Sequence, residues 1–369
     1  MNQKTVMTCI GTRPEAIKMA PVIRCLEATG WANTVTVATG QHRELLDQAL
    51  DVFDLQVEFD LDLMREEQDP IRLASRVLDG LGSVFQRVEP DFVLAQGDTT
   101  TLLATTIASY YSRIPFGHVE AGLRTFDPLS PFPEEGNRVV AAQLATIHFA
   151  PTQQARRNLL RENIPRDRIH VVGNTIVDTL YSVAERAENV GPELPSGRRL
   201  LVVTVHRRES FGLPVQAICR ALRAIVHRFP DVEILWPLHP NPAVADPVRE
   251  SMKDVDRVRL VPALPYVDFI GAMKKAFLVL TDSGGVQEEA PVLGVPVLVL
   301  RERTERLEAI DAGVARLVGT SAPEIERQTA LLLDNPSLHR RMAIRCSPFG
   351  DGNAAPRIVA SLQKALARH

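Results

Sequence analysis

Three glutamates lie close together in residues 118–138, a segment that reads HVEAGLRTFDPLSPFPEEGNR. They are Glu120, Glu134 and Glu135, and no long apolar run separates them. Long irregular segments are uncommon inside compact domains, and those that occur are usually functional or disordered. Carboxyl groups gathered at one site push their proton affinities apart, so one can act as an acid while another acts as a base. The alternative is that Glu134 and Glu135 only begin a helix after Pro133, where acidic side chains favour the helix dipole.

A second candidate site is the stretch Asp282-Ser283-Gly284-Gly285, which follows an apolar run and precedes a helical pattern. Bare backbone N–H groups and the positive end of a helix can approach an anion closely, so the stretch predicts a diphosphate seat. Glu289 follows Ser283 by between one and two helical turns, where its carboxylate could accept hydrogen bonds from a ribose diol. An ordinary helix N-cap with a solvated acidic first turn would give the same pattern.

Cationic side chains follow several of the other apolar runs. Arg13 precedes Pro14, which suits the first turn of a helix. His206 and His239 each follow an apolar run in the second half of the chain. A lone histidine there is more often structural, but two that converge on one seat favour phosphate contact. Neither the dinucleotide glycine fingerprint nor the lysine-bearing P-loop follows any run, so the sequence does not support bound NAD or ATP.

Short apolar runs alternate with segments of helical period along the whole chain, in two sets. The runs are 6–10, 34–38, 92–95, 114–117 and 147–150, then 200–205, 233–237, 258–261, 278–281 and 297–300. This alternation predicts an α/β protein with two doubly wound, Rossmann-like domains. The turn-rich segment 191–197 has the composition of a linker between them. Ligands of such sheets bind beyond the carboxyl ends of the strands, so we expect the active site in the cleft between the domains.

Composition limits the classes of function. The chain has 369 residues, of which 45% are hydrophobic and 24% charged, and this is ordinary for a globular protein of two domains. A net charge of -3 argues against a nucleic-acid partner. No apolar run approaches the roughly 18 to 20 residues of a membrane span, and no signal peptide is evident, so we expect a cytoplasmic protein. The four cysteines lack the paired spacing of zinc or redox motifs, and we predict no metal site.

A series of motifs resembles those of the non-hydrolysing UDP-N-acetylglucosamine 2-epimerases of bacteria, which have a glycosyltransferase-B-like architecture. The motifs are GTRPEAIKMAP (11–21), GQHRELLDQ (40–48), QGDTTT (96–101), HVEAGLRT (118–125), PFPEEGNR (131–138), VGNTIVD (172–178), HRRESFG (206–212), LTDSGGVQEEAP (280–291) and TERLEA (304–309). They extend over nearly the whole chain in the family's order, which makes the set far more specific than any single motif.

The resemblance implies reversible epimerisation at C2 of UDP-N-acetylglucosamine to UDP-N-acetylmannosamine, without a cofactor, for a cell-envelope or capsular polysaccharide. It implies catalytic roles for Asp98, Glu120, Glu134 and His206. It implies contacts with the substrate or UDP at Arg13, Lys18, His239, Ser283, Gly284, Gly285 and Glu289. It also implies a homodimer and a last helix, within 354–369, that packs on the first domain. We therefore expect domains of residues 1–185 with 354–369, and 186–353.

The chemistry implied by the resemblance explains the need for several carboxylates. The hydrogen on C2 is not next to a carbonyl, so its direct removal would be very slow. If UDP leaves C1 first or at the same time, the positive charge that develops at C1 acidifies this hydrogen, and a glycal forms. Re-addition of UDP, with the proton delivered to the other face, requires acid and base groups on both faces of the sugar. Asp98 and Glu134 are candidates for this pair, with Glu120 positioning the sugar or stabilising charge, and the assignment within the trio stays open.

The chain departs from the family's pattern in a few places. Leu307 replaces a usual proline, and Val314-Ala315 replaces a usual threonine-containing pair. Some family members are activated by a second substrate molecule, and the resemblance places its contacts at Gln41, Glu44, residue 67, Glu134, Arg207 and His239. An arginine is common at position 67 in those members, whereas Glu67 in this chain would repel a diphosphate. We therefore expect weak activation.

Three alternatives to a non-hydrolysing epimerase stay open at this point. A hydrolysing 2-epimerase would share the fold and motifs but release N-acetylmannosamine and UDP. A UDP-sugar-dependent glycosyltransferase would use the same nucleotide seat but needs only one base, so the three carboxylates count against it. A binding protein without activity would not need acid and base groups on two faces of a sugar.

Overall fold

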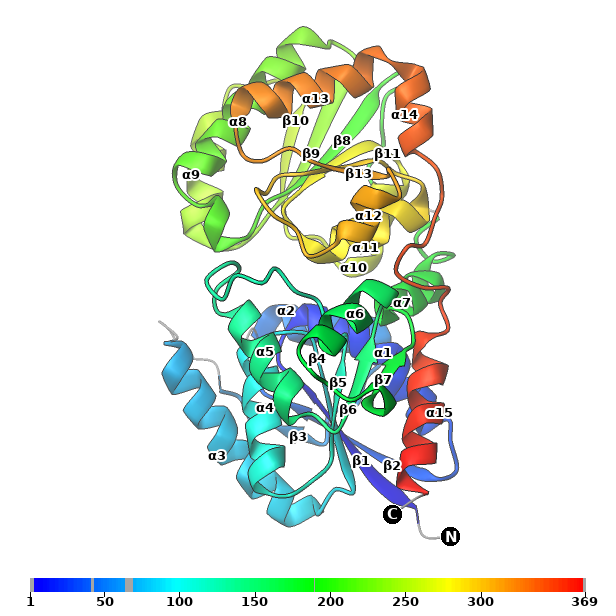
Figure 1. The fold of residues 1–369 in the computed structure, drawn as a ribbon. Helices are drawn as coiled ribbons and strands as arrows, with labels where there is room; N and C mark the ends of the chain where they lie inside the picture. Colours follow the sequence, from blue (N-terminus) through cyan, green and yellow to red (C-terminus); the bar gives the residue numbers. More distant parts are fainter. Residues whose placement is uncertain (1–2, 41–42, 64–68, 189, 368–369) are drawn as a thin grey trace. The chain divides into compact units, whose positions relative to one another are not determined.

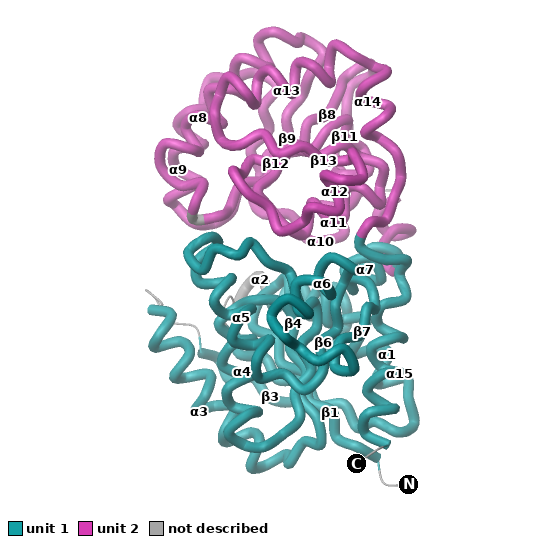
Figure 2. Tube along the Cα trace, in the orientation of Figure 1, with its two compact units in different colours: residues 1–181, 349–369 teal, residues 182–348 magenta. Residues whose placement is uncertain are grey.

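The computed structural model describes residues 3–40, 43–63, 69–188 and 190–367, and the chain forms two compact units (Figures 1 and 2). Unit 1 comprises Met1–Tyr181 together with Phe349–His369, and unit 2 comprises Ser182–Pro348. Each unit is an α/β domain with a parallel sheet, which confirms the predicted fold class. No helix of the described residues is long and apolar enough to cross a membrane.

The described part of unit 1 contains a seven-stranded parallel sheet with the order β3-β2-β1-β4-β5-β6-β7. Its strands are β1 (Lys4–Ile10), β2 (Ala32–Ala38), β3 (Phe59–Asp60), β4 (Phe92–Gln96), β5 (Phe116–Val119), β6 (Ile147–Ala150) and β7 (Ile169–Val171). The strand order reverses between β1 and β4. The loops after these two strands therefore begin at the topological switch point, where ligands of such sheets bind.

Helices cover both faces of this sheet. They are α1 (Arg13–Glu27), α2 (Arg43–Phe53), α3 (Pro70–Val88), α4 (Thr100–Tyr111), α5 (Glu134–Leu144), α6 (Gln153–Arg161), α7 (Thr175–Val183) and α15 (Ala354–Leu366), with a 3-10 turn at Arg166–Arg168. Helix α1 packs against α2 and α15, and α4 packs against α3 and α5, so each group forms one layer (Figure 1). Side chains such as Met7 and Val93 of the strands and Leu81 of α3 are fully buried in the core on the α3–α4 side.

The C-terminal helix docks on unit 1 through its own N-terminus. Asp178 of α7 accepts hydrogen bonds from the backbone N–H groups of Ala354 and Ala355, at 3.2 and 2.9 Å. These are two of the N–H groups that a helix start leaves without an intrahelical partner. Asp178 therefore stabilises the point at which α15 begins.

The described part of unit 2 contains a six-stranded parallel sheet with the order β10-β9-β8-β11-β12-β13. Its strands are β8 (Arg199–Thr204), β9 (Val232–Leu238), β10 (Val258–Pro262), β11 (Ala276–Thr281), β12 (Val297–Val299) and β13 (Ala315–Leu317). Its helices are α8 (Leu213–Arg228), α9 (Pro242–Met252), α10 (Tyr266–Lys274), α11 (Gly284–Leu293), α12 (Leu307–Asp311), α13 (Ala322–Asp334) and α14 (Pro336–Met342), with a 3-10 turn at Arg208–Ser210. The strand order here reverses between β8 and β11.

The helices of unit 2 also form two layers. Helix α8 packs against α9 and α13, and α11 packs against α10 and α12 (Figure 1). Trp236 of β9 is fully buried in the core that the first of these layers covers. The turn-rich segment 191–197 belongs to unit 2, where the side chain of Lys275 donates to the carbonyls of Gly191 and Pro192.

Every predicted strand overlaps an observed strand, but one of them is shifted along the chain. Strand β5 is Phe116–Val119 and not 114–117, so His118 lies within the strand. His118 is tolerated there because its Nε2 forms a hydrogen bond of 2.8 Å with the carbonyl of Gly97. Helix α5 begins at Glu134, directly after Pro133, as the alternative in the sequence analysis has it, and Glu135, Asn137 and Arg138 near its start are buried.

Candidate active site

Glu15 joins the two loops at the switch point of unit 1. Its carboxylate accepts hydrogen bonds from Gly11 N at 3.0 Å, from Thr12 Oγ1 at 2.9 Å and from Thr99 Oγ1 at 2.6 Å. Burial raises the pKa of Glu15 to about 7, although these hydrogen bonds act in the opposite direction. The loop after β1 is thus tied to Thr99, the residue that follows Asp98 in the loop after β4.

The same two loops are in close steric contact at Gly11. A Cβ atom on this residue would lie 2.1 Å from Thr101 Oγ1, so no other residue fits without displacement. Arg13, two residues further on, is the first residue of α1, and Pro14 follows it as the sequence predicts. The start of α1, which includes Arg13, therefore lies beside the loop that carries Asp98.

Asp98 is held by two residues of α5. Its Oδ2 lies 3.4 Å from Nη1 of the buried Arg138, and its carbonyl accepts a hydrogen bond of 2.8 Å from Asn137 Nδ2. The Asp98 side chain remains 27% exposed, so its carboxylate can meet a substrate. Because α5 begins at Glu134, these contacts bring Glu134 to the same edge of the sheet.

Glu120 follows β5, the neighbour of β4, and points into a buried polar cluster. Its Oε2 accepts hydrogen bonds from Lys18 Nζ at 2.5 Å and from Gln96 Nε2 at 2.9 Å. Its backbone is left-handed, with φ of 65°, which costs a non-glycine residue on the order of 1 kcal/mol. Such strain persists only where the surroundings impose it, and the contacts to Lys18 and Gln96 do so here. Lys18, which the resemblance assigns to the substrate, thus also contacts a candidate catalytic carboxylate.

Glu135 differs from Glu134 in its surroundings. It is buried, and its Oε1 accepts hydrogen bonds from the backbone N–H groups of Thr125 and Phe126, at 3.0 and 2.9 Å. Its Oε2 lies 3.2 Å from Nε of Arg138. Glu135 therefore connects the irregular segment of residues 121–133 to α5. Its carboxylate has a structural role.

Asp282 joins the two loops at the switch point of unit 2. Its carboxylate accepts hydrogen bonds from the backbone N–H of His206 at 3.0 Å, from that of Arg207 at 2.9 Å and from Ser210 Oγ at 2.8 Å. Nδ1 of His206 lies 3.0 Å from its Oδ1. Burial opposes the ionisation of Asp282, but His206 and these donors lower its pKa below the ordinary range.

The two predicted histidines of unit 2 lie together. The rings of His206 and His239 are stacked, with centroids 6.2 Å apart and an interplanar angle of 25°. Both side chains are partly exposed. Nδ1 of His239 accepts a hydrogen bond of 3.2 Å from the backbone N–H of Asn241, which begins the turn into α9.

The predicted diphosphate seat has the expected strand, turn and helix. Ser283 is the N-cap residue of α11, but its side chain makes no capping hydrogen bond, so it does not occupy the first N–H groups of the helix. A Cβ atom on Gly284 would lie 2.7 Å from Cζ of Arg306, whereas one on Gly285 would meet nothing closer than 4.0 Å. Gly284 thus allows a buried guanidinium under the helix start. Arg306 is paired with Glu288 at 2.9 Å and with Glu305.

Glu289 lies on the buried side of α11. Its Oε1 accepts a hydrogen bond of 2.8 Å from the hydroxyl of Tyr266 in α10. The sequence analysis did not identify Tyr266, because only the packing of α10 on α11 brings it to Glu289. Glu15, Asn137, Arg138 and Asp282 stand inside the recognised motifs, but no local pattern points to the contacts that they make with distant segments.

The residues predicted for a second substrate site are only partly described. Gln41 and Glu67 lie outside the described residues, and Glu44 lies in the first turn of α2. Nη2 of Arg207 lies 3.8 Å from Oε1 of the buried Glu305. No group of three or more His, Cys, Asp or Glu side chains in the described residues could hold a metal ion.

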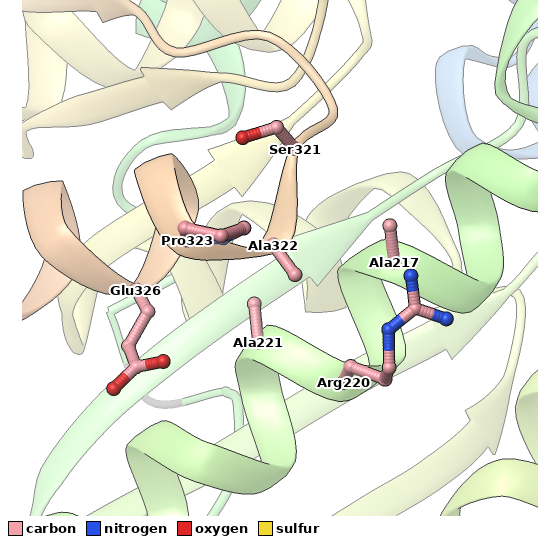
Figure 3. Close-up of a pocket in the computed structure, with 7 residues that line it drawn as sticks. All are labelled: Ala217, Arg220, Ala221, Ser321, Ala322, Pro323 and Glu326. Carbon is pink, nitrogen blue, oxygen red and sulfur yellow. The ribbon is translucent and has the colours of Figure 1, made fainter.

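A hollow of about 560 Å³ lies elsewhere on unit 2, between α8 and the start of α13 (Figure 3). Its lining is Ala217, Arg220, Ala221, Ser321, Ala322, Pro323 and Glu326. It contains no residue of the predicted site. We therefore do not assign substrate binding to it.

Comparison with known proteins gives one family over nearly the whole chain. The family model described as UDP-N-acetylglucosamine 2-epimerase matches residues 24–363. The UDP-N-acetylglucosamine 2-epimerase of Yersinia pestis is 45% identical over 97% of this chain and 98% of its own. A crystal structure of UDP-GlcNAc 2-epimerase from Neisseria meningitidis bound to UDP-GlcNAc superposes with a TM-score of 0.94 at 40% identity, covering 98% of this chain and 100% of that one. The Methanocaldococcus jannaschii enzyme in complex with UDP-GlcNAc and UDP gives 0.87 at 32% identity, with 98% and 99% covered.

Proposed function

The chain belongs to the UDP-N-acetylglucosamine 2-epimerase family, and on that premise we propose that it interconverts UDP-N-acetylglucosamine and UDP-N-acetylmannosamine by eliminating and re-adding UDP. The observation that carries the mechanism is the group of carboxylates at the carboxyl edge of the sheet of unit 1. Asp98 and Glu120 follow the neighbouring strands β4 and β5, and Glu134 begins the helix that holds Asp98.

The proposed reaction moves one proton and one leaving group. The bond between C1 and the diphosphate oxygen breaks, and its electron pair stays on that oxygen. The proton on C2 passes to a carboxylate, and the electrons of the C2–H bond form the double bond of a glycal. Addition of UDP to C1, with a proton delivered to the opposite face of C2, completes the inversion. No oxidant or reductant is consumed.

In unit 1, Asp98 and Glu134 would exchange the C2 proton on the two faces of the sugar. Nη1 of Arg138 lies 3.4 Å from Oδ2 of Asp98 and holds this carboxylate at the edge of the sheet. Glu120 is paired with Lys18 and therefore suits a role in positioning the sugar or balancing charge at C1. Arg13 at the start of α1 would contact a phosphate, for which its planar guanidinium is well suited.

In unit 2, the residues described above would bind the nucleotide part. The backbone N–H groups at Gly284 and Gly285 and the hydroxyl of Ser283 would meet the diphosphate at the positive end of α11, since the N–H of Ser283 already donates to Thr281 Oγ1 at 2.9 Å. His206 and His239 would donate to the same group, which stabilises the charge that develops as UDP leaves. Glu289, oriented by Tyr266, would accept hydrogen bonds from the ribose.

A homodimer is the proposed assembly, and an exposed apolar surface on unit 1 supports it. Tyr110 and Tyr111 at the end of α4 are more than half exposed, and Val139 and Val140 of the adjacent α5 are also exposed. Exposed apolar side chains on neighbouring helices are typical of protein contacts. The molecular mass in solution tests this proposal. That the protein is cytoplasmic, and that its product is used for a cell-envelope or capsular polysaccharide, stay predictions.

One incubation distinguishes the proposed function from its alternatives. With UDP-N-acetylglucosamine alone, we expect UDP-N-acetylmannosamine to accumulate until both UDP-sugars are present in constant proportion. Free UDP should stay far below the amount of product. UDP and free N-acetylmannosamine formed in step with turnover would instead identify a hydrolysing epimerase. UDP formed only after an acceptor sugar is added would identify a transferase.

A further inference from the structure

The Nδ1 atoms of the two stacked histidines have partners of opposite type. Nδ1 of His206 lies 3.0 Å from Oδ1 of Asp282, a carboxylate oxygen that can only accept a hydrogen bond. Nδ1 of His239 lies 3.2 Å from the backbone nitrogen of Asn241, a group that can only donate. A neutral imidazole carries one proton, and the partner of one ring nitrogen decides which nitrogen holds it.

From this contrast we infer that Asp282 and the backbone of Asn241 hold His206 and His239 in opposite tautomers. In its neutral form His206 carries its proton on Nδ1, so Nε2 has a free lone pair and can take up a second proton. His239 carries its proton on Nε2 and is a fixed hydrogen-bond donor. His206 is therefore the histidine that can exchange a proton at Nε2, and Asp282 is the residue that positions it.

The surroundings of Asp282 fix the direction of this contact. The N–H groups of His206 and Arg207 and the hydroxyl of Ser210 all donate to Oδ2, at 3.0, 2.9 and 2.8 Å, and the N–H of His206 is shared with Oδ1 at 3.2 Å. The carboxylate is fully buried and cannot rotate without losing these hydrogen bonds. Its pKa is lowered below the ordinary range by His206 and these N–H groups despite burial, so Asp282 stays ionised. His239 on the loop after β9 stacks on His206, and Arg207 follows His206 in the chain, with its guanidinium 3.8 Å from the buried Glu305.

This inference rests on the proposed function for its chemical meaning. When the C1–O bond breaks, negative charge develops on the oxygen of the departing diphosphate. A protonated His206 can donate from Nε2 to this oxygen, and the ionised Asp282 behind it stabilises the imidazolium. Re-addition of UDP returns the proton to Nε2, so the cycle consumes none. Asp282 acts only through His206, which makes it a positioning residue.

The wild-type protein provides the first test, without any substitution. Nitrogen-15 NMR of the full chain with labelled histidine distinguishes a protonated from an unprotonated ring nitrogen, and the variant His206→Gln assigns the signals of His206. When both rings are neutral, we expect a protonated Nδ1 and an unprotonated Nε2 for His206, and the reverse for His239. A proton on Nε2 of neutral His206 would overturn the inference.

Asp282→Asn tests the control of the tautomer. The carboxamide oxygen is needed on the side where the N–H of Arg207 and the hydroxyl of Ser210 donate, so its NH2 group must face Nδ1 of His206. Nδ1 must then accept, and the proton moves to Nε2. We expect a reversed tautomer and a kcat lowered by at least about a hundredfold, as for a lost acid or base group, with UDP affinity little changed. Unchanged His206 signals in this variant would contradict the role of Asp282.

Ser210→Ala is the matched control. It removes one hydrogen bond to Oδ2 of Asp282 but leaves Oδ1 facing His206. We expect wild-type tautomers and nearly wild-type kcat in Ser210→Ala. If Asp282 only stabilised the loop after β8, both Ser210→Ala and Asp282→Asn would disturb this loop and lower kcat. NMR and activity together also distinguish failure of the proposed function from failure of the tautomer inference. Opposite tautomers in a protein that does not epimerise would refute the proposed function alone, and epimerisation with any other tautomer of His206 would refute this inference alone.

Discussion

Nζ of Lys18 lies 2.5 Å from Oε2 of Glu120, and both side chains are buried. Removing one partner of a buried ion pair leaves an uncompensated charge and usually costs about 3–5 kcal/mol. We therefore expect Lys18→Met to lower the free energy of unfolding by about this amount in denaturant titrations. Lys4→Met is the control, because the Lys4–Asp91 pair is substantially exposed and such pairs contribute about 0–1 kcal/mol. An equal loss of unfolding free energy in both variants would show that the buried Lys18–Glu120 pair contributes no more to stability than an exposed pair.

The carboxylates and the nucleotide-binding residues should differ in their kinetic effects. We expect Asp98→Asn, Glu120→Gln and Glu134→Gln each to lower turnover by at least about a hundredfold, the low end for a lost acid or base group. These changes preserve shape and should leave UDP binding intact. Arg13→Ala and His239→Ala should mainly weaken UDP binding. Calorimetric titration with UDP beside steady-state kinetics checks this division, and an equal loss of UDP affinity in both groups would refute it.

Glu15 should make stability depend on pH. Its pKa is about 7 in the folded protein, whereas a glutamate in an unfolded chain titrates near pH 4.3. The folded state therefore binds this proton more tightly, so its contribution to stability is complete below about pH 4.3 and is lost as the pH rises through about 7. At about 1.4 kcal/mol per pKa unit, the loss is on the order of 3 kcal/mol.

Glu15→Gln isolates this contribution because glutamine does not titrate. We expect the wild type to lose stability relative to this variant between about pH 5 and about pH 8, measured by chemical denaturation at both values. A difference that stays constant with pH would mean that the hydrogen bonds from Gly11, Thr12 and Thr99 outweigh burial.

Activation by a second substrate molecule should be weak in this protein. The family resemblance places Glu67 at the second substrate site, where a carboxylate would repel a diphosphate that an arginine would bind, and weaker effector binding would mean weaker coupling between sites. We expect a nearly hyperbolic forward curve, and a reverse reaction from pure UDP-N-acetylmannosamine that needs no added UDP-N-acetylglucosamine. Glu67→Arg should make the forward curve more sigmoidal. A strongly sigmoidal wild-type curve, or a reverse reaction that is silent without UDP-N-acetylglucosamine, would contradict this interpretation.

The two sheets could be predicted because buried parallel strands give continuous apolar runs, of which residues 92–95 are an example. Strands β3, β7 and β13 could not, since each has only two or three residues and shows no periodicity. The contacts of Glu135 in the first turn of α5 could not be predicted either. Its carboxylate accepts hydrogen bonds from two backbone N–H groups that lie nine and ten residues earlier in the chain.

The positions of the candidate site residues follow from topology, but their partners do not. Asp98 and Ser283 are found at the ends of strands, which the sequence locates well. The contact of Glu15 with Thr99 joins residues 84 apart, and that of Asp282 with the N–H of His206 joins residues 76 apart. No local pattern encodes such pairs. They form only when the strand order of each sheet places the two loops side by side.

Epimerisation in heavy water tests the elimination mechanism most directly. A proton NMR time course with UDP-N-acetylglucosamine, without added NAD or metal, follows the hydrogen at C2 of both sugars. Because the C2 proton is removed by a carboxylate and replaced from the other face, we expect UDP-N-acetylmannosamine with solvent deuterium at C2. UDP-N-acetylmannosamine that forms at the same rate but retains the original hydrogen at C2 would contradict the mechanism.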